Sequence, residues 1–476
     1  MRRPRGVTNS GVLEVTANTL NENNLNMKRY LSLDILRGLT IFGMVFSAII
    51  PHRLLPAWMY HIQNPPPEHT LDFSVSGIGW VDLVFPIFIF CMGVAIPFAG
   101  ASGKMSVKSV FVRFLMLWLF SYLYVFLDFS TASGWLPQLA TVGGFAALFM
   151  LYMSKPPHKW IRYAGAFLSV ALIVAGALFF DENISIFRSG IIIFLLSFLY
   201  LFGALIWLYT KDNLKMRLVI YVIILLFSVV TMYFSLPARL YAIKEIRWFF
   251  NIEYIYFLLI LIPGTYIGDV LREKSKLPEG YNPVKNSPAS AFIKIMMVTY
   301  LLTFVIWMLV ALFSDWNLYK MLFSASASLI IWLITKRAFP EHAFVSFIAL
   351  VMMIAGGLFL FYEGAITKVP CTVSYCLFTT GLSIYLLMIS DFISHKYPSS
   401  YFSRIFGGAG SNPLMSYITF GALVMPVFKL TGLIHIYIAA YPPGWPWIGV
   451  ARAAAAVLLT MALVAFVSEK KLFWRA

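Results

Sequence analysis

Residues 51–100 contain the stretch on which the fold depends. They read PHRLLPAWMYHIQNPPPEHT at 51–70 and, after a short linker, WVDLVFPIFIFCMGVAIPFAG at 80–100. The first part is polar, is broken by prolines and holds three of the seven histidines. The second is apolar over about the 20 residues that a membrane-spanning helix needs, and it carries Asp82 near its start. Ionisable groups at membrane depth usually have a function, so we expect the rest of the chain to hold this patch at one face of a membrane.

The composition is that of a polytopic membrane protein. The 476 residues are 60% hydrophobic and 12% charged, whereas a soluble domain carries about 25% charged residues. The mean hydropathy is +0.82. We predict an all-α transmembrane bundle of about 14 helices, with spans near residues 33–51, 81–100, 108–128, 136–153, 162–180, 188–209, 217–235, 252–271, 292–314, 319–335, 344–361, 371–390, 412–433 and 447–468.

The distribution of lysine and arginine predicts how the bundle is oriented. If both termini are cytoplasmic and all fourteen runs cross, 27 of the 36 basic residues fall in cytoplasmic segments, as the positive-inside rule requires. The net charge of +16 is therefore a topology signal, and nucleic acid is not expected as a partner. Residues 1–30 read as a disordered cytoplasmic tail and 31–476 as one domain. The three cysteines predict neither a disulfide framework nor a metal site.

Two histidines in the first outer loop are candidate catalytic bases. His61 and His69 flank three consecutive prolines, Pro65 to Pro67, which stiffen the loop. A histidine titrates near neutral pH and can activate an amine or a hydroxyl. Asp82 could orient one of them, as a carboxylate does in a catalytic dyad. The structural alternatives are solvated loop histidines and an aspartate bonded to a neighbouring helix.

Several basic and glycine-rich positions near the predicted cytoplasmic face could hold an anionic ligand. Arg37 follows Asp34 by three residues, so the two can also form a structural pair. Arg272 and Lys274 follow the glycine-containing end of the eighth run, and Asn412 follows a glycine-rich turn. Glycines let a backbone approach a phosphate, and neighbouring cations can neutralise it. Glycine-rich helix ends are common, so a purely structural role stays open for each.

Aromatic residues at the outer face are candidate platforms for a sugar ring. These are Trp58, Trp80 and Tyr437. Their alternative role is the interfacial aromatic belt that membrane proteins build. No Walker A sequence and no zinc motif is present in the chain.

The order of these motifs resembles a known family. It comprises Ser-x-Asp-x-x-Arg-Gly at 32–38, Trp-x-x-His at 58–61, Asp-Leu-Val-Phe-Pro at 82–86 and Ser-Asn-Pro-Leu-Met-Ser-Tyr at 411–417. The pattern resembles the transmembrane acetyltransferases typified by heparan-α-glucosaminide N-acetyltransferase, and most closely their bacterial relatives of the DUF5009 type. Where that family has an active-site asparagine after helix 1, this sequence has Ser47-Ala48.

The resemblance implies a reaction and a location. Acetyl-CoA would bind from the cytoplasm, near Arg37, Arg272, Lys274 and Asn412, with no metal. Its acetyl group would pass to the amine of a terminal glucosamine, of heparan or a related glycan, on the far side of the membrane. His61 matches the catalytic histidine best, and His69 competes with it. The expected location is the bacterial inner membrane, the chain lying in the lipid bilayer, and a homodimer stays open.

Three other functions remain open at this point. The replaced asparagine leaves O-acetylation of a periplasmic or cell-wall sugar as a variant. Fourteen helices with intramembrane charges would suit a secondary transporter, although the two halves of the chain show no repeat of the kind common in transporters. A non-catalytic scaffold would leave two histidines and an aspartate beside one helix unexplained.

Overall fold

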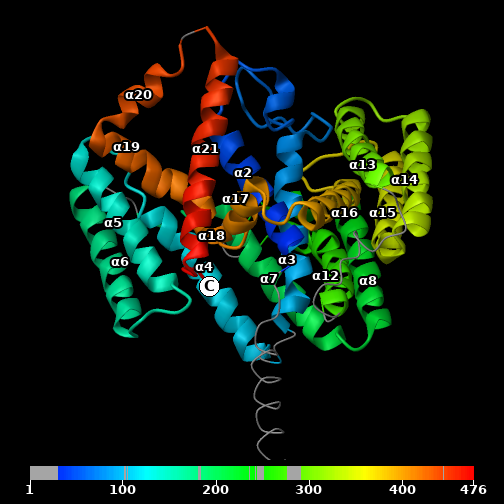
Figure 1. Ribbon diagram of the computed structural model, residues 1–476, viewed down its shortest axis with the longest axis horizontal. Coiled ribbons are helices and arrows are strands. Elements are labelled where there is room, and N and C mark those ends of the chain that lie inside the picture. Colours follow the sequence, from blue (N-terminus) through cyan, green and yellow to red (C-terminus); the bar gives the residue numbers. More distant parts are fainter. Residues whose placement is uncertain are drawn as a thin grey trace, which may run out of the picture.

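The computed structural model in Figure 1 describes residues 30–100, 103, 105–180, 184–234, 236–241, 243, 251–275, 291–442 and 444–475. Helices dominate this part of the chain, which holds no strand beyond one isolated bridge between Met153 and Trp474. The predicted disordered tail lies outside the described residues apart from Tyr30. The single-domain prediction and the cytoplasmic placement of the two termini stay predictions.

Fourteen helical segments are long and apolar enough to cross a membrane, one for each predicted run, so the predicted multi-pass helical fold is confirmed. Twelve are single helices: α2 (Leu31–Ile49), α3 (Trp80–Gly100), α4 (Val107–Phe126), α5 (Trp135–Tyr152), α6 (Trp160–Phe179), α7 (Ile191–Thr210), α8 (Leu214–Tyr233), α13 (Ala291–Leu312), α14 (Leu318–Ala338), α15 (Ala343–Glu363), α16 (Val373–Lys396) and α21 (Pro446–Glu469).

The other two spans are interrupted. The eighth consists of α11 (Glu253–Tyr256) and α12 (Leu258–Ser275). The thirteenth consists of α18 (Pro413–Thr419), the π-helical turn η3 (Phe420–Val424) and α19 (Met425–Thr431). Pi-helical turns inside helices are frequent at functional sites, and here the turn lies beside the large cavity described below. Two short elements lie outside the spans, η1 (Ala57–Met59) and α9 (Leu236–Tyr241). A third, η2 (Pro340–His342), begins the eleventh span directly before α15.

Burial separates the central helices from the peripheral ones. In α16, 89% of the spanning window is buried inside the protein, and in α12 the share is 78%. In α6 it is only 17%, which fits a helix whose apolar side chains face lipid. Figure 1 shows α2, α3 and α16 in the middle of the bundle, with α5 and α6 at one edge and α13 to α15 at the other.

Glycines set the closest helix contacts around the centre. A Cβ at Gly93 of α3 would lie 2.2 Å from the carbonyl oxygen of Leu261 on α12, and one at Gly268 would lie 2.4 Å from that of Val94. Small residues at such positions let membrane helices approach backbone to backbone. This contact holds α3, and with it Asp82, against the centre of the bundle.

Two short helices lie where the sequence predicts only loops. Residues 401–410, expected in a cytoplasmic loop, form α17 (Tyr401–Gly410), and residues 433–439 form α20 (Leu433–Ala439). A Cβ at Gly38 of α2 would lie 2.0 Å from the Phe406 carbonyl oxygen, so α17 packs directly on the α2 backbone. Ten residues are too few to span a bilayer, which is why hydropathy along the chain did not indicate α17.

Candidate catalytic site

The loop between α2 and α3, residues 50–79, is fastened to the bundle at both of its ends. Tyr60 donates its hydroxyl to the carbonyl oxygen of Pro51 at 2.5 Å, which closes the first half of the loop on itself. Gly77 donates its backbone N–H to the carbonyl oxygen of Ile366 at 2.8 Å, which ties the second half to the segment before α16. The side chains of this loop are therefore held in place against the helices.

His61 and Asp82 form a hydrogen-bonded pair at the start of α3. His61 Nδ1 lies 2.7 Å from Asp82 Oδ1. The other carboxylate oxygen of Asp82 accepts the backbone N–H groups of Ile62 at 3.1 Å and Gly79 at 3.2 Å. Asp82 is 2% exposed. An ionised carboxylate only accepts hydrogen bonds, so Nδ1 of His61 carries the proton and Nε2 keeps a free lone pair.

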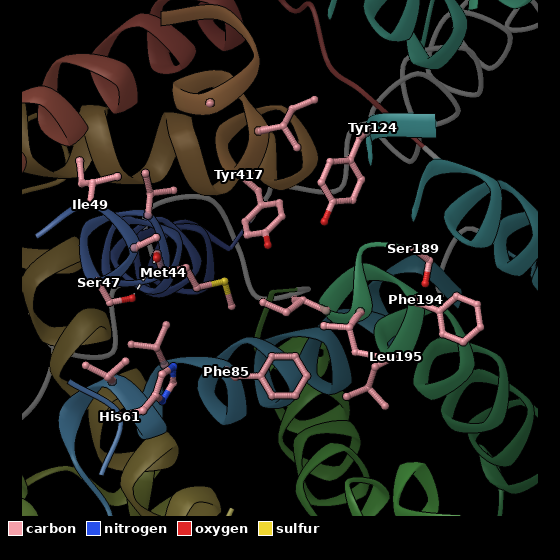
Figure 2. A pocket seen from close by; sticks show the side chains of 18 of the residues that line it. Met44, Ser47, Ile49, His61, Phe85, Tyr124, Ser189, Phe194, Leu195 and Tyr417 are labelled. Carbon is pink, nitrogen blue, oxygen red and sulfur yellow. Dashed lines mark hydrogen bonds between the residues drawn. The ribbon is translucent and has the colours of Figure 1, made fainter. Parts of the chain in front are cut away.

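Nε2 of His61 is the atom available for chemistry. The His61 side chain is 40% exposed, whereas its partner is almost fully covered. Its ring lines a large cavity, and Figure 2 shows it at one wall, near Ser47 and Met44 of α2. A base whose orientation is set by a buried carboxylate and whose second nitrogen faces a cavity is the arrangement that general-base catalysis needs.

The cavity has a volume of about 1490 Å³, larger than the roughly 300–1,000 Å³ of ordinary small-molecule sites. Its walls come from α2, α3, α4, α7, α11 and the broken thirteenth span, and Figure 2 shows Phe85 and Leu195 facing Tyr124 and Tyr417 across it. Apolar side chains make up much of the lining. The polar side chains that line it are Ser47, His52, Tyr60, His61, Asn64, His69, Tyr124, Asp128, Ser130, Thr131, Ser189, Asn251, Glu253, Tyr254, Lys368, Tyr417 and Lys429.

His69 also lines the cavity, but its surroundings differ from those of His61. Its ring packs 4.2 Å from that of His52 and 4.5 Å from that of Tyr60, measured between centroids. Its Nε2 accepts the backbone N–H of Arg53 at 3.2 Å. Burial and then the neighbouring His52 lower the pKa of His69. Because its Nε2 is occupied and no carboxylate of the described residues bonds to its ring, His69 is the weaker of the two candidate bases.

The structure adds residues that the sequence did not single out. Lys368, from the segment between α15 and α16, lines the cavity close enough to Asp82 for their charges to interact. Glu253 of α11 and the facing tyrosines Tyr124 and Tyr417 line it as well. For Lys368 the sequence did hold a signal, since it is one of the nine basic residues that break the predicted positive-inside pattern.

The residues predicted to hold acetyl-CoA do not line this cavity, and each contacts other groups of the protein. Arg37 lies 3.3 Å from Asp34 and donates to the Cys91 carbonyl oxygen at 3.2 Å. Arg272 pairs with Glu273 at 3.2 Å. Lys274 donates to the carbonyl oxygen of Glu341. Their assignment to a donor site stays a prediction.

Asn412 has a structural role in this arrangement. Its side chain is fully buried; it donates to the Leu472 carbonyl oxygen at 3.0 Å and accepts the Trp474 backbone N–H at 3.0 Å. These two bonds tie the segment after α21 to the turn between α17 and α18. With both ends of its amide occupied, Asn412 has little left to offer a ligand.

The three predicted sugar platforms lie outside the cavity lining. Trp58 is 49% exposed and packs 6.1 Å from Trp447. Trp80 packs against Phe46 of α2, and Tyr437 of α20 packs against the Arg452 guanidinium. Their positions agree better with interface anchoring than with contact to a ligand at His61.

Comparison with known proteins gives a family without a described activity. The sequence model of the family described as a domain of unknown function (DUF5009) matches residues 29–271. This range includes α2, the loop 50–79, α3 and most of α12. No curated protein matches the chain. Within the part of the chain that the structure describes, no group of three or more His, Cys, Asp or Glu side chains is arranged to hold a metal ion.

Proposed function

This chain belongs to the DUF5009 family, and we propose that it is a transmembrane acyltransferase of the bacterial inner membrane. It would move an acetyl group from cytoplasmic acetyl-CoA to the amine of a terminal glucosamine on the far side. The observation that carries the proposal is the His61–Asp82 pair, 2.7 Å apart, with the second histidine nitrogen facing a cavity large enough for a glycan end.

His61 would act as the general base of the transfer. The acceptor nitrogen attacks the thioester carbonyl, forming a C–N bond, while His61 Nε2 takes the proton that this nitrogen loses. The C–S bond then breaks, and the departing CoA sulfur takes up a proton as a free thiol. Asp82 stabilises the imidazolium formed in between and keeps Nδ1 protonated throughout. A positioned base of this kind contributes roughly 10²–10⁴-fold to a rate.

The donor would have to reach the cavity from the opposite side. Arg37 and Met44 lie on the same face of α2. They are seven residues, or about 10 Å along the helix axis, apart. Met44 lines the cavity and Arg37 does not. A thioester on a long flexible arm suits this distance, provided that the helices around Arg37 move apart to admit it. The apolar walls near Met44 and Phe85 would exclude water from the thioester.

Two alternative functions are compatible with the same site. A hydroxyl acceptor would use His61 in the same way, which would make the chain an O-acetyltransferase. A large cavity lined by ionisable groups also suits one state of a secondary transporter. A transporter needs no acetyl-CoA and produces no thiol, so release of free CoA separates it from both acyltransferases.

The test is release of free CoA by the detergent-purified protein, with acetyl-CoA supplied in the presence and absence of glucosamine. We expect glucosamine-dependent release that His61→Ala lowers by at least about 100-fold and that His69→Ala lowers far less. Equal loss in both variants, or none in His61→Ala, would contradict the assigned base. Acetyl-CoA that neither binds nor reacts would overturn the acyltransferase proposal in favour of transport.

A further inference from the structure

Lys368 is held rigidly beside the His61–Asp82 pair. The side chain of Gln63, two residues after His61, accepts the backbone N–H groups of Lys368 at 3.2 Å and Val369 at 3.0 Å. It also donates to the Val369 carbonyl oxygen at 2.6 Å. The backbone at Lys368 is thus hydrogen-bonded to the loop that carries His61, and the Lys368 side chain lines the same cavity as His61.

The ammonium group of Lys368 has no partner among the described residues. No hydrogen bond or ion pair of its Nζ is found there, although the residue is only partly exposed. The charge of Asp82 acts on it, but the oxygens of Asp82 already accept hydrogen bonds from His61 and two backbone N–H groups. Burial lowers the pKa of Lys368, and Asp82 offsets this only in part.

Lys429, the other lysine in the cavity lining, provides a contrast. Its Nζ donates to the carbonyl oxygen of Ser130 at 2.7 Å, so its charge is already engaged by the protein. A buried charge is costly unless it is paired. Lys368 therefore lacks the hydrogen-bond acceptor that Lys429 has, and an anionic ligand in the cavity can supply one.

We infer that Lys368 is an anion-binding subsite and that the acceptor carries a carboxylate, sulfate or phosphate close to the group that is acylated. The inference rests on the proposed acyl transfer and specifies its acceptor as an acidic glycan end. The anion would sit on the Lys368 ammonium while the reacting amine or hydroxyl lies at His61 Nε2. A neutral amino sugar would leave the ammonium unpaired and would bind more weakly.

The test compares acceptors that differ in charge. Glucosamine, its 6-sulfate, its 6-phosphate and a disaccharide of glucosamine with a hexuronic acid are supplied with acetyl-CoA to the wild type, Lys368→Met and Lys429→Met. We expect at least one acidic acceptor to have a KM about tenfold or more below that of glucosamine, since hydrogen bonds to charged groups are the strong ones. Lys368→Met should remove this preference and Lys429→Met should keep it.

The outcomes separate this inference from the proposed function. Release of CoA without any preference for acidic acceptors would overturn the inference and leave acyl transfer standing. A fall in kcat with acidic and neutral acceptors alike in Lys368→Met would also overturn it, because the ammonium would then serve the reaction and not the ligand. No release with any acceptor would end the proposed function.

A binding measurement keeps the inference testable without turnover. Isothermal titration of the acidic disaccharide into wild type and Lys368→Met should show a loss of affinity of about tenfold or more in the variant. Equal affinities would refute the subsite. Lys368→Arg should retain most of the affinity, since it keeps the charge. The Gln63 bonds are to the main chain, so both Lys368 variants should fold.

Discussion

Replacing Asp82 by asparagine tests whether the carboxylate fixes which ring nitrogen of His61 carries the proton. The carboxylate uses one oxygen for His61 and the other for the N–H groups of Ile62 and Gly79. An asparagine side chain has one oxygen and one NH₂ group. If its oxygen faces His61, two buried backbone donors meet an NH₂ group, at a cost of about 1–3 kcal/mol each. The opposite orientation is therefore favoured.

In that orientation the NH₂ group faces Nδ1 of His61. Nδ1 must then accept, so the ring carries its proton on Nε2, toward the cavity, and no longer acts as a base there. We expect Asp82→Asn to fold with a melting temperature close to that of the wild type but to lose roughly 10²–10⁴-fold in kcat, the usual contribution of a positioned base.

Thiol release and thermal unfolding would be measured together. Asp72→Asn is the matched control, because Asp72 is an exposed acid of the same loop whose carboxylate accepts hydrogen bonds from Ser74. Adding His61→Ala to Asp82→Asn should cause little further loss, since both changes remove one base. Activity of Asp82→Asn within tenfold of the wild type would refute the reasoning, because the carboxylate would then not control the tautomer.

Two further predictions concern packing and pH. Gly93→Ala should lower the stability of the bundle by about 1–3 kcal/mol, seen as a lower melting temperature, because the new Cβ would lie 2.2 Å from the backbone oxygen of Leu261. The control is Gly143→Ala, whose Cβ would meet only a side chain at 3.5 Å and which should change the melting temperature little. Equal effects of the two substitutions would contradict the packing argument. The KM for an acidic acceptor should rise with pH as Lys368 loses its proton. This rise should begin below the ordinary lysine pKa of about 10.4, because burial lowers the pKa of Lys368. The same pH dependence of KM in Lys368→Arg would show that another group titrates.

The spanning helices were predictable from local sequence. Each needs about 20 apolar residues to satisfy its backbone inside a bilayer, so hydropathy alone marks it, even for the short run that became α14. The same rule did not indicate α17, which at ten residues is too short to cross a bilayer and packs on the α2 backbone, and it could not indicate the π-helical turn inside the thirteenth span. Both α17 and the π-helical turn depend on how neighbouring helices pack around them.

For the candidate site too, the sequence indicated some features and the tertiary structure decided others. The sequence by itself indicated His61, His69 and Asp82, because ionisable groups stand out against an apolar chain. It left open which histidine pairs with Asp82, since His61 lies 21 positions before Asp82 in the chain and His69 lies 13 positions before it. Tertiary structure decided this point: the folding of the loop through Tyr60 and Gly77 brings Nδ1 of His61 to the carboxylate.

Lys368 shows what only the tertiary structure could decide. It lies about 300 residues from His61 in the chain. The side chain of Gln63 joins the two segments at the cavity wall through bonds to residues 368 and 369, and the bonds of Ile366 to residues 76 and 77 join the same two segments. Local sequence determines whether a segment is a helix, because backbone hydrogen bonding in lipid is satisfied within the segment. Which distant side chains share a cavity depends on helix packing and on loop–loop hydrogen bonds, which no local pattern records.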